Sequence, residues 1–437
     1  MAATVTFPPL ARARGPGYWL RLPNLWASRR SFLRADRSIA WRDRYNLELA
    51  PADDARTEPF SRLLGRPVRG GFRFLILADT GEGDRSQYGL VPLIRALAPD
   101  FLLISGDVAY PAGRLEDFRH GFFAPYRGLG LPVWAVPGNH EYYSGRHGRE
   151  FFEVFCTQRH AEEWRRAGLR PVPQPGMNWE LREPGAAPLV VLGVDTGMRG
   201  RLDRGWRRPA DERQHAWLDA RLAEADRKGL AAIVMFHAPG LLRGRHDRRT
   251  RLGTLHRLIA AHPSVRLVTC GHEHNFQRYP AAVFRRYLEQ VHDVPPDAPA
   301  RPEYVVCGGG GAYLNATTLG RTRYRPQTVY PSARKWRSYA RMGERIVASL
   351  GLSKEVIGAL VGRIDSAARA DADVAQYLSM LLVEVTAARV RVTPVFLDDV
   401  GALYSDLPDG REVRVDDPTV PVSAAAVARC LQESFTL

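Results

Sequence analysis

Five short polar motifs, each placed directly after an apolar run, constrain the fold of this 437-residue chain more than any other feature. The clearest run covers residues 72–78, has the length of a buried strand, and is followed by Asp79-Thr-Gly81. The other four motifs are Gly106-Asp-Val-Ala-Tyr110, Gly138-Asn-His-Glu141, His237 and Gly271-His-Glu-His274. Because ligands of open α/β sheets bind outside the carboxyl ends of the strands, we expect all five motifs to meet at one edge.

Residues 1–70 show no clear period, but strand-like and helix-like segments alternate from residue 72 to residue 307. Besides 72–78, strands are expected at 101–104, 132–136, 189–194, 232–236, 266–270 and 303–307. Helices are expected at 88–97, 115–126, 210–228 and 251–261. This alternation predicts a layered α/β fold. After Gly311 the order breaks: residues 342–372 look helical, and a strand pair is expected at 381–385 and 390–395.

The motifs supply Asp, Tyr, Asn and His side chains and no thiolate. Oxygen and imidazole donors suit Fe, Mn or Zn. Seven donors exceed the needs of one ordinary ion, whereas two ions sharing a carboxylate would use them all. Such a pair, about 3.5–4 Å apart, promotes in-line displacement at phosphorus. Each motif alone is more typical of a cap, a loop or a hydrogen-bonded core histidine, but five such coincidences are improbable.

The ordered set resembles the calcineurin-like metallophosphoesterases and, within them, the purple acid phosphatases. That group's pattern is Asp-x-Gly, Gly-Asp-x-x-Tyr, Gly-Asn-His-Asp/Glu, Val-x-x-His and Gly-His-x-His, and this sequence fills every position. The broader family has Asp-x-His first, where this chain has Gly81, and Tyr110 would be the substitute ligand. The resemblance covers residues 71–316 well and 378–410 weakly. It implies a four-layer α/β/β/α sandwich with an amino-terminal extension and a helical insertion.

The resemblance also implies a role for each residue. The first metal, ferric in the family, would be held by Asp79, Asp107, Tyr110 and His274. The second, Fe(II), Zn or Mn, would be held by Asp107, Asn139, His237 and His272, with Asp107 bridging. His140 would contact the phosphoryl group or protonate the leaving oxygen, and His246 would be a second outer histidine.

The same resemblance divides the chain into four parts. Residues 1–70 would be a basic, aromatic-rich extension, 71–316 the core, 317–377 a partly helical insertion, and 378–437 the closing strands and tail. Trp19, Trp26 and Trp41 of the extension lie among arginines, a mixture that would bind nucleic acid or an anionic membrane surface, or simply pack over the core.

The chain is strongly basic, with 62 Lys and Arg against 47 Asp and Glu, or +15. Such a bias is common in GC-rich genomes, but it also suits an anionic partner. Arginines cluster at 199–208 and 243–251, where they would either steer a substrate or form a solvated surface. The glycine-rich run 307–312 lacks the Lys-Ser/Thr of a phosphate loop, so we interpret it as structural.

No run approaches ~18 apolar residues, so no transmembrane helix is expected. The four cysteines are widely spaced, which favours a reducing compartment over a disulfide framework. A twin-arginine-like run at 28–34 is followed by charged rather than apolar residues, so we interpret it as non-functional and expect a cytoplasmic location.

These observations predict a binuclear-metal phosphoesterase that hydrolyses phosphate monoesters by attack of a metal-bound hydroxide. The substrate would be a phosphorylated small molecule or a phosphoprotein. One alternative is a phosphodiesterase or nuclease using the same site, with the basic loops contacting nucleic acid. An alternative of another class is an inactive scaffold that binds phosphorylated ligands or nucleic acid.

Overall fold

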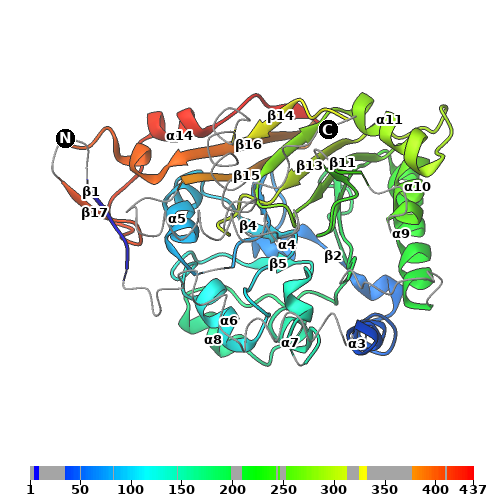
Figure 1. Ribbon diagram of the computed structural model, residues 1–437, viewed down its shortest axis with the longest axis horizontal. Coiled ribbons are helices and arrows are strands. Elements are labelled where there is room, and N and C mark those ends of the chain that lie inside the picture. The colour runs from blue at the N-terminus through cyan, green and yellow to red at the C-terminus, as the bar shows by residue number, and fades with distance from the viewer. Residues whose placement is uncertain are drawn as a thin grey trace, which may run out of the picture.

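Two large β-sheets pack face to face and carry helices on their outer faces (Figure 1). The computed structural model describes residues 4–8, 35–49, 51–81, 83–144, 146–197, 209–242, 245–246, 252–312, 324–331, 376–408 and 411–437. The Trp19 and Trp26 positions, the predicted helical stretch 342–372 and most of the two arginine clusters lie outside these residues.

The first sheet has six strands in the order β18-β16-β15-β3-β4-β5. Its parallel part consists of β3 (Phe72–Leu77), β4 (Phe101–Ile104) and β5 (Val133–Ala135). The other three strands are β15 (Gln376–Val385), β16 (Val390–Asp399) and β18 (Phe435–Thr436). Strand β15 pairs antiparallel with β3 along five residues, from Leu381 opposite Ile76 to Val385 opposite Phe72. The predicted strand pair near the carboxyl terminus therefore completes the sheet that begins the core.

The second sheet has eight strands in the order β14-β12-β13-β11-β8-β7-β6-β2. Its centre is parallel: β7 (Leu189–Gly193), β8 (Ala231–Met235), β11 (Val265–Cys270) and β13 (Glu303–Cys307). The flanking strands are β2 (Thr57–Glu58), β6 (Trp179–Arg182), β12 (Phe276–Tyr279) and β14 (Thr328–Tyr330). The central strands read as nearly continuous apolar runs because both of their faces are buried.

Alternate residues of the strands fill different cores. Phe74 and Ile76 of β3 point between the sheets, where they meet Ile233 of β8, whereas Leu75 and Leu77 point outward. Helix α5 (Arg85–Leu97) covers that outer face. Helices α9 (Pro209–Lys228), α10 (Gly253–Ala261) and α11 (Ala281–His292) cover the outer face of the second sheet (Figure 1). The predicted four-layer α/β/β/α arrangement is confirmed.

Several elements were not expected from the sequence. Strands β6, β12 and β14 and helix α11 fall in segments to which we assigned no element, and the extension contains α3 (Ala35–Leu47) and α4 (Phe60–Leu64). The helix expected at 115–126 is instead α6 (Leu115–Phe118) followed by a π-helical turn, η2 (Arg119–Phe123).

The remaining elements are short. They are β1 (Thr4–Thr6), η1 (Asp53–Arg56), η3 (His140–Tyr142), α7 (Arg149–Phe155), α8 (Ala161–Arg166), β9 (Leu241–Leu242), β10 (Arg245–His246), η4 (Val400–Tyr404), β17 (Glu412–Arg414) and α14 (Ala424–Cys430). Among the described residues, no helix is both long and apolar enough to cross a membrane.

Candidate metal centre

The polar motifs meet where β3, β4 and β5 of one sheet end opposite β8 and β11 of the other. The backbone turns sharply as it leaves these strands. Asp79 and Asp107 follow β3 and β4 with φ of 56° and 51°, and His272 follows β11 with φ of 72°. Few residues other than glycine adopt this left-handed region. Its use at three neighbouring strand ends aims carboxylate and imidazole groups into one space.

Four side chains from three motifs form the first group. The Tyr110 hydroxyl lies 3.1 Å from Asp79 Oδ1, 3.2 Å from Asp107 Oδ2 and 3.0 Å from His274 Nε2. His274 Nε2 lies 3.4 Å from Asp79 Oδ1. All four residues are buried. Asp79, Asp107 and His274 each offer one atom within 4.8 Å of the others, a spacing that suits a metal ion.

The second group combines an amide with two imidazoles. Asn139 Oδ1 lies 3.1 Å from His237 Nε2 and 2.7 Å from His272 Nδ1. His237 Nε2 also lies 3.1 Å from Asp107 Oδ2. The other ring nitrogen of His237 lies 2.9 Å from the carbonyl oxygen of Ser105. Because a carbonyl only accepts, this Nδ1 carries the hydrogen and Nε2 is directed into the site.

Asp107 belongs to both groups. Burial alone would raise the pKa of Asp107, but the imidazoles of His237 and His140 outweigh burial and hold the pKa below its usual range. Burial alone would lower the pKa of His237, but Asp107 outweighs it and raises the pKa to about 9. A carboxylate that remains ionised between two groups of donors is what a bridging ligand requires.

His140 lies beside the first group without joining it. Its ring packs against the Tyr110 ring with centroids 4.1 Å apart, and its Nε2 is 3.9 Å from Asp107 Oδ2. Its Nδ1 lies 2.7 Å from the Pro111 carbonyl oxygen and therefore carries the hydrogen. Burial lowers the pKa of His140, although Asp107 acts in the opposite direction.

Residues 72–276 match the sequence model of the family described as calcineurin-like phosphoesterase. The core of this chain is therefore similar to that family. No curated protein sequence matches the chain. The matched segment begins at the first residue of β3 and ends in β12, so it contains every predicted metal ligand and excludes both ends of the chain.

Solved structures similar to this chain include a purple acid phosphatase from yellow lupin seeds, 13% identical over 83% of this chain, with a TM-score of 0.48. This chain spans 56% of the length of the lupin protein. GAP50, described as the anchor in the inner membrane complex of Plasmodium, is 12% identical over 84% of this chain and 96% of its own, with a TM-score of 0.47. A dimetal phosphatase from Danio rerio is 11% identical over 76% of this chain and 98% of its own, with a TM-score of 0.40.

Gly81 stands where the broader family has histidine, and the structure gives a steric reason for the glycine. A Cβ atom at position 81 would lie 1.9 Å from the carbonyl oxygen of Val108, which is backbone and cannot turn aside. The Tyr110 amide donates to the Gly81 carbonyl over 2.9 Å. The two ligand loops therefore pack too closely for any side chain at position 81, and Tyr110 occupies the space between Asp79 and Asp107.

Glu141 supports the site, although the sequence analysis assigned it no role beyond its place in a motif. Its carboxylate accepts from the backbone amides of Asp107, Val108, Ala109 and Gly138 over 2.7–3.0 Å. Burial, and then the nearby Asp107, raises the pKa of Glu141 to about 8, while the backbone amides act to lower it. Glu141 thereby joins the Asp107 loop to the Asn139 loop from beneath.

Other predicted features are placed less completely. His246 lies in β10, which forms a two-stranded hairpin with β9, but its side chain is outside the described part of the structure, as are the arginines of the two clusters. The glycine-rich run after β13 packs on the first ligand loop, because the Ala312 amide donates to the Asp79 carbonyl over 2.8 Å. This contact agrees with the structural interpretation of that run.

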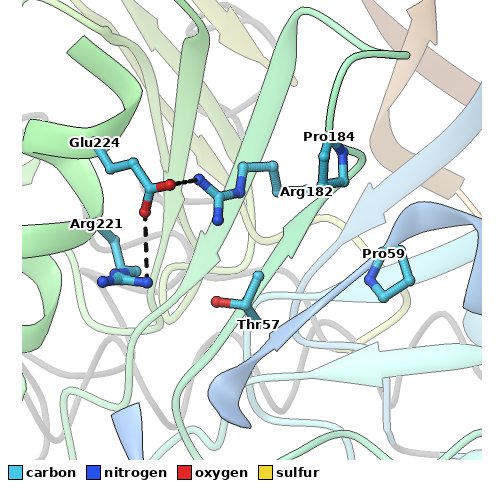
Figure 2. Close-up of a pocket in the computed structure, with 6 residues that line it drawn as sticks. All are labelled: Thr57, Pro59, Arg182, Pro184, Arg221 and Glu224. Atoms are coloured by element: carbon cyan, nitrogen blue, oxygen red, sulfur yellow. Dashed lines mark ion pairs between the residues drawn. The ribbon is translucent and has the colours of Figure 1, made fainter. Parts of the chain in front are cut away.

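A second polar hollow lies at the opposite ends of the strands (Figure 2). Arg182, at the end of β6, pairs with Val190 at the start of β7, whereas the metal ligands follow the carboxyl ends of the central strands. Glu224 of α9 lies 2.5 Å from Arg182 Nη1 and 3.5 Å from Arg221 Nη1. The carboxylate of Glu224 is thus paired with the arginines that line this hollow. The hollow is therefore not the metal centre.

Proposed function

We propose that this protein is a binuclear-metal phosphoesterase that hydrolyses phosphate monoesters. The observation that carries the proposal is Asp107, a buried carboxylate 3.2 Å from the Tyr110 hydroxyl and 3.1 Å from His237 Nε2. One carboxylate thus serves two groups of donors, as a bridging ligand must. The match of residues 72–276 to the calcineurin-like phosphoesterases supports the same reaction class.

The donors fit two different ions. Asp79, Asp107, Tyr110 and His274 would hold the first ion, and three oxygen donors with one imidazole suit ferric iron. Asp107, Asn139, His237 and His272 would hold the second, and the neutral amide and imidazoles suit Fe(II), Zn or Mn. When bound, such ions activate a water molecule and neutralise charge on a phosphoryl group.

His140 would exchange a proton with the leaving oxygen through Nε2. Its Nδ1 is held by the Pro111 carbonyl over 2.7 Å, which fixes the ring so that Nε2 lies 3.9 Å from Asp107 Oδ2. A fixed imidazole beside the reacting group suits proton transfer, and because Nδ1 already carries a hydrogen, Nε2 would first take up a proton and then give it to the leaving oxygen. His246 remains a proposed second outer histidine on the hairpin that follows β8.

The substrate would be a phosphorylated small molecule or a phosphoprotein, and Tyr110 favours a monoester by its resemblance to the purple acid phosphatases. The test compares hydrolysis of a chromogenic phosphate monoester and of its diester by metal-loaded protein. A faster monoester rate that falls by at least ~10²–10³-fold in Asp107→Asn supports the proposal. A faster diester rate would indicate a phosphodiesterase or nuclease instead, and metal binding without hydrolysis of either would favour a binding scaffold.

A separate measurement tests iron at the first position. In the purple acid phosphatases, a tyrosinate bound to ferric iron gives the visible colour. Iron-loaded protein should therefore show a visible absorption band that Tyr110→Phe removes, while Tyr143→Phe, which alters a neighbouring hydroxyl that accepts from Asn139 over 2.8 Å, should retain it. A band that survives in Tyr110→Phe would refute the assignment of this ligand.

A further inference from the structure

The amino-terminal helix α3 inserts an arginine into the core close to the metal centre. Arg42 is buried although it belongs to the segment before the phosphoesterase core. Its Nε donates to Asp195 Oδ2 over 3.1 Å, its Nη1 to Asp211 Oδ1 over 2.6 Å, and its Nη2 to the Asp195 carbonyl over 2.7 Å. Figure 1 shows α3 beside the lower end of α9, the helix that carries Asp211.

Asp195 gathers groups from two separate parts of the chain, helix α3 and the turn η3. It follows β7 and is fully buried. Its Oδ2 accepts from Arg42 Nε, from Asn46 Nδ2 over 3.0 Å, and from the Tyr142 hydroxyl over 2.9 Å. Burial acts to lower the pKa of Arg42, but Asp195 and Asp211 outweigh it and raise the pKa above its ordinary value. The buried ion pair is therefore charged and well satisfied.

Tyr142 connects this ion pair to the metal ligands. It ends the turn η3, and its amide donates to the carbonyl of Asn139 over 3.2 Å. The same turn contains His140 and Glu141, and Glu141 accepts from the Asp107 loop. The turn is therefore held from two sides, by Glu141 toward the first ligand loop and by Tyr142 toward Asp195 and Arg42.

Asp195 also lies next to the loop that follows His237, an imidazole of the second group. The Ala238 amide, one residue after His237, donates to the hydroxyl of Thr196 over 3.5 Å. Asn139 and His237, two donors of the second group, therefore lie on segments that contact this network. A shift of Asp195 would consequently move the supports of both, whereas Asp79 and His274 are carried by other loops.

We propose that Arg42 and Asp195 are positioning residues for the second metal ion, acting through Tyr142 on the Asn139 turn. Helix α3 is then a functional part of the metal centre rather than a separate extension. This inference rests on the ligand assignment of the proposed function, and it concerns ion affinity rather than the reaction. The principle is general, since groups that orient metal ligands often change ion affinity or activity about 10–100-fold when removed.

The experiment measures binding of Zn²⁺ and of Mn²⁺ to full-length protein by calorimetry, well below the melting temperature of each variant. Arg42→Met should weaken one of the two bound ions by ~10-fold or more and leave the other unchanged. Tyr142→Phe removes only the hydroxyl that contacts Asp195, so it should fold normally and show the same selective effect. Arg213→Met is the matched control, because Arg213 Nη1 donates to the Leu47 carbonyl of α3 without contacting Asp195.

Selective weakening in Arg42→Met and Tyr142→Phe, but not in Arg213→Met, supports the inference. Equal ion affinities in all four proteins, with lower melting temperatures alone, would overturn it and leave Arg42 as a structural anchor. A failure of the proposed function would give a different result. Wild-type protein would then bind two ions but hydrolyse neither the monoester nor the diester. The ion-affinity comparison would still decide the role of Arg42.

Discussion

The two ends of the central strands use the same backbone conformation for opposite purposes. At the metal centre, left-handed residues are Asp79, Asp107 and His272, whose side chains point at one another. At the far end, the left-handed positions include Gly185 and Gly229, where a Cβ would meet nothing within 4 Å. Placing non-glycine residues in this conformation costs about 1–3 kcal/mol each and is concentrated at functional sites. Other left-handed non-glycine residues, such as Ala98 and Asp293, simply end helices, whereas the three at the metal centre bring proposed ligands together.

The charges differ in the same way. At the far end, Glu224 pairs with Arg182 (Figure 2) at 2.5 Å and, outside that view, with Lys228 at 2.7 Å, so these neighbours neutralise it. Those contacts, led by the hydrogen bond to Lys228, lower the pKa of Glu224 to about 2. At the metal centre, Asp79 and Asp107 both lie within 3.2 Å of the Tyr110 hydroxyl and face imidazoles. At the far end the carboxylate of Glu224 already has cationic partners, whereas the metal centre is arranged for added cations.

The largest expected difference between the two ends comes from substituting one glutamate at each end. Glu141→Gln at the metal centre should lose at least two of the four backbone amides that the carboxylate accepts, because one carboxamide oxygen replaces two carboxylate oxygens. Each buried amide left unsatisfied costs about 1–3 kcal/mol. We expect a lower melting temperature and a ~10–100-fold weaker metal affinity.

Glu224→Gln is the counterpart at the far end. Glu224 pairs with Arg182, Arg221 and Lys228 but contacts no proposed ligand. Calorimetric metal binding should therefore resemble the wild type, whereas the melting temperature should fall because Arg182 and Arg221 lose their anionic partner. Equal effects of the two substitutions on metal affinity would contradict the special status of the metal-centre end.

The next largest difference is expected between two glycines, Gly81 at the metal centre and Gly176 away from it. Gly81→Ala would place a Cβ 1.9 Å from the Val108 carbonyl oxygen and force the two ligand loops apart. Overpacking of this kind typically costs about 1–3 kcal/mol, so we expect a lower melting temperature together with weaker metal binding. At Gly176 the closest atom to an added Cβ is Pro51 Cδ at 3.4 Å, an ordinary contact, and Gly176→Ala should change neither quantity. Unchanged metal binding in Gly81→Ala would mean that the loops can separate without consequence.

The sequence predicted the layers and the convergence of the motifs because both follow from local patterns. Apolar runs such as 72–78 mark buried strands, and parallel strands bring their carboxyl ends to one edge. The strand at 381–385 was also predicted, and the resemblance made it a closing strand of the core, but its pairing with β3 was not predicted. Assignment of the proposed ligand roles to individual side chains likewise depended on resemblance and remains a prediction.

What the sequence did not reveal depends on contacts between distant segments. Arg42 and Asp195 are 153 positions apart, and no local pattern distinguishes this buried arginine from the many exposed ones. The edge strand β14 and its neighbour β12 pair across about 50 residues and mix polar with apolar side chains, so they lack a clear strand signal. Glu141 could have been singled out from the sequence. It is the acidic residue of the Gly-Asn-His-Glu motif, and because no ligand role was assigned to it, a supporting role was the remaining interpretation.

A buried histidine away from both ends gives the smallest effect and shows that acid sensitivity need not arise at the metal centre. His256 of α10 is fully buried, with Nδ1 3.1 Å from His292 Nε2. Burial, then His292 and Arg257, lowers the pKa of His256 well below its ordinary value. The unfolded chain therefore binds a proton near pH 6.5 that the folded chain does not bind. The free energy of unfolding is unaffected by this group above that pH and falls by ~1.4 kcal/mol per pH unit below it.

His256→Gln should make the melting temperature decline less between pH 7 and pH 5.5 than it does in wild-type protein, with both measured free of metal. An equally steep decline in the variant would show that the acid sensitivity arises elsewhere, and the imidazoles around Asp107 would be the next groups to substitute.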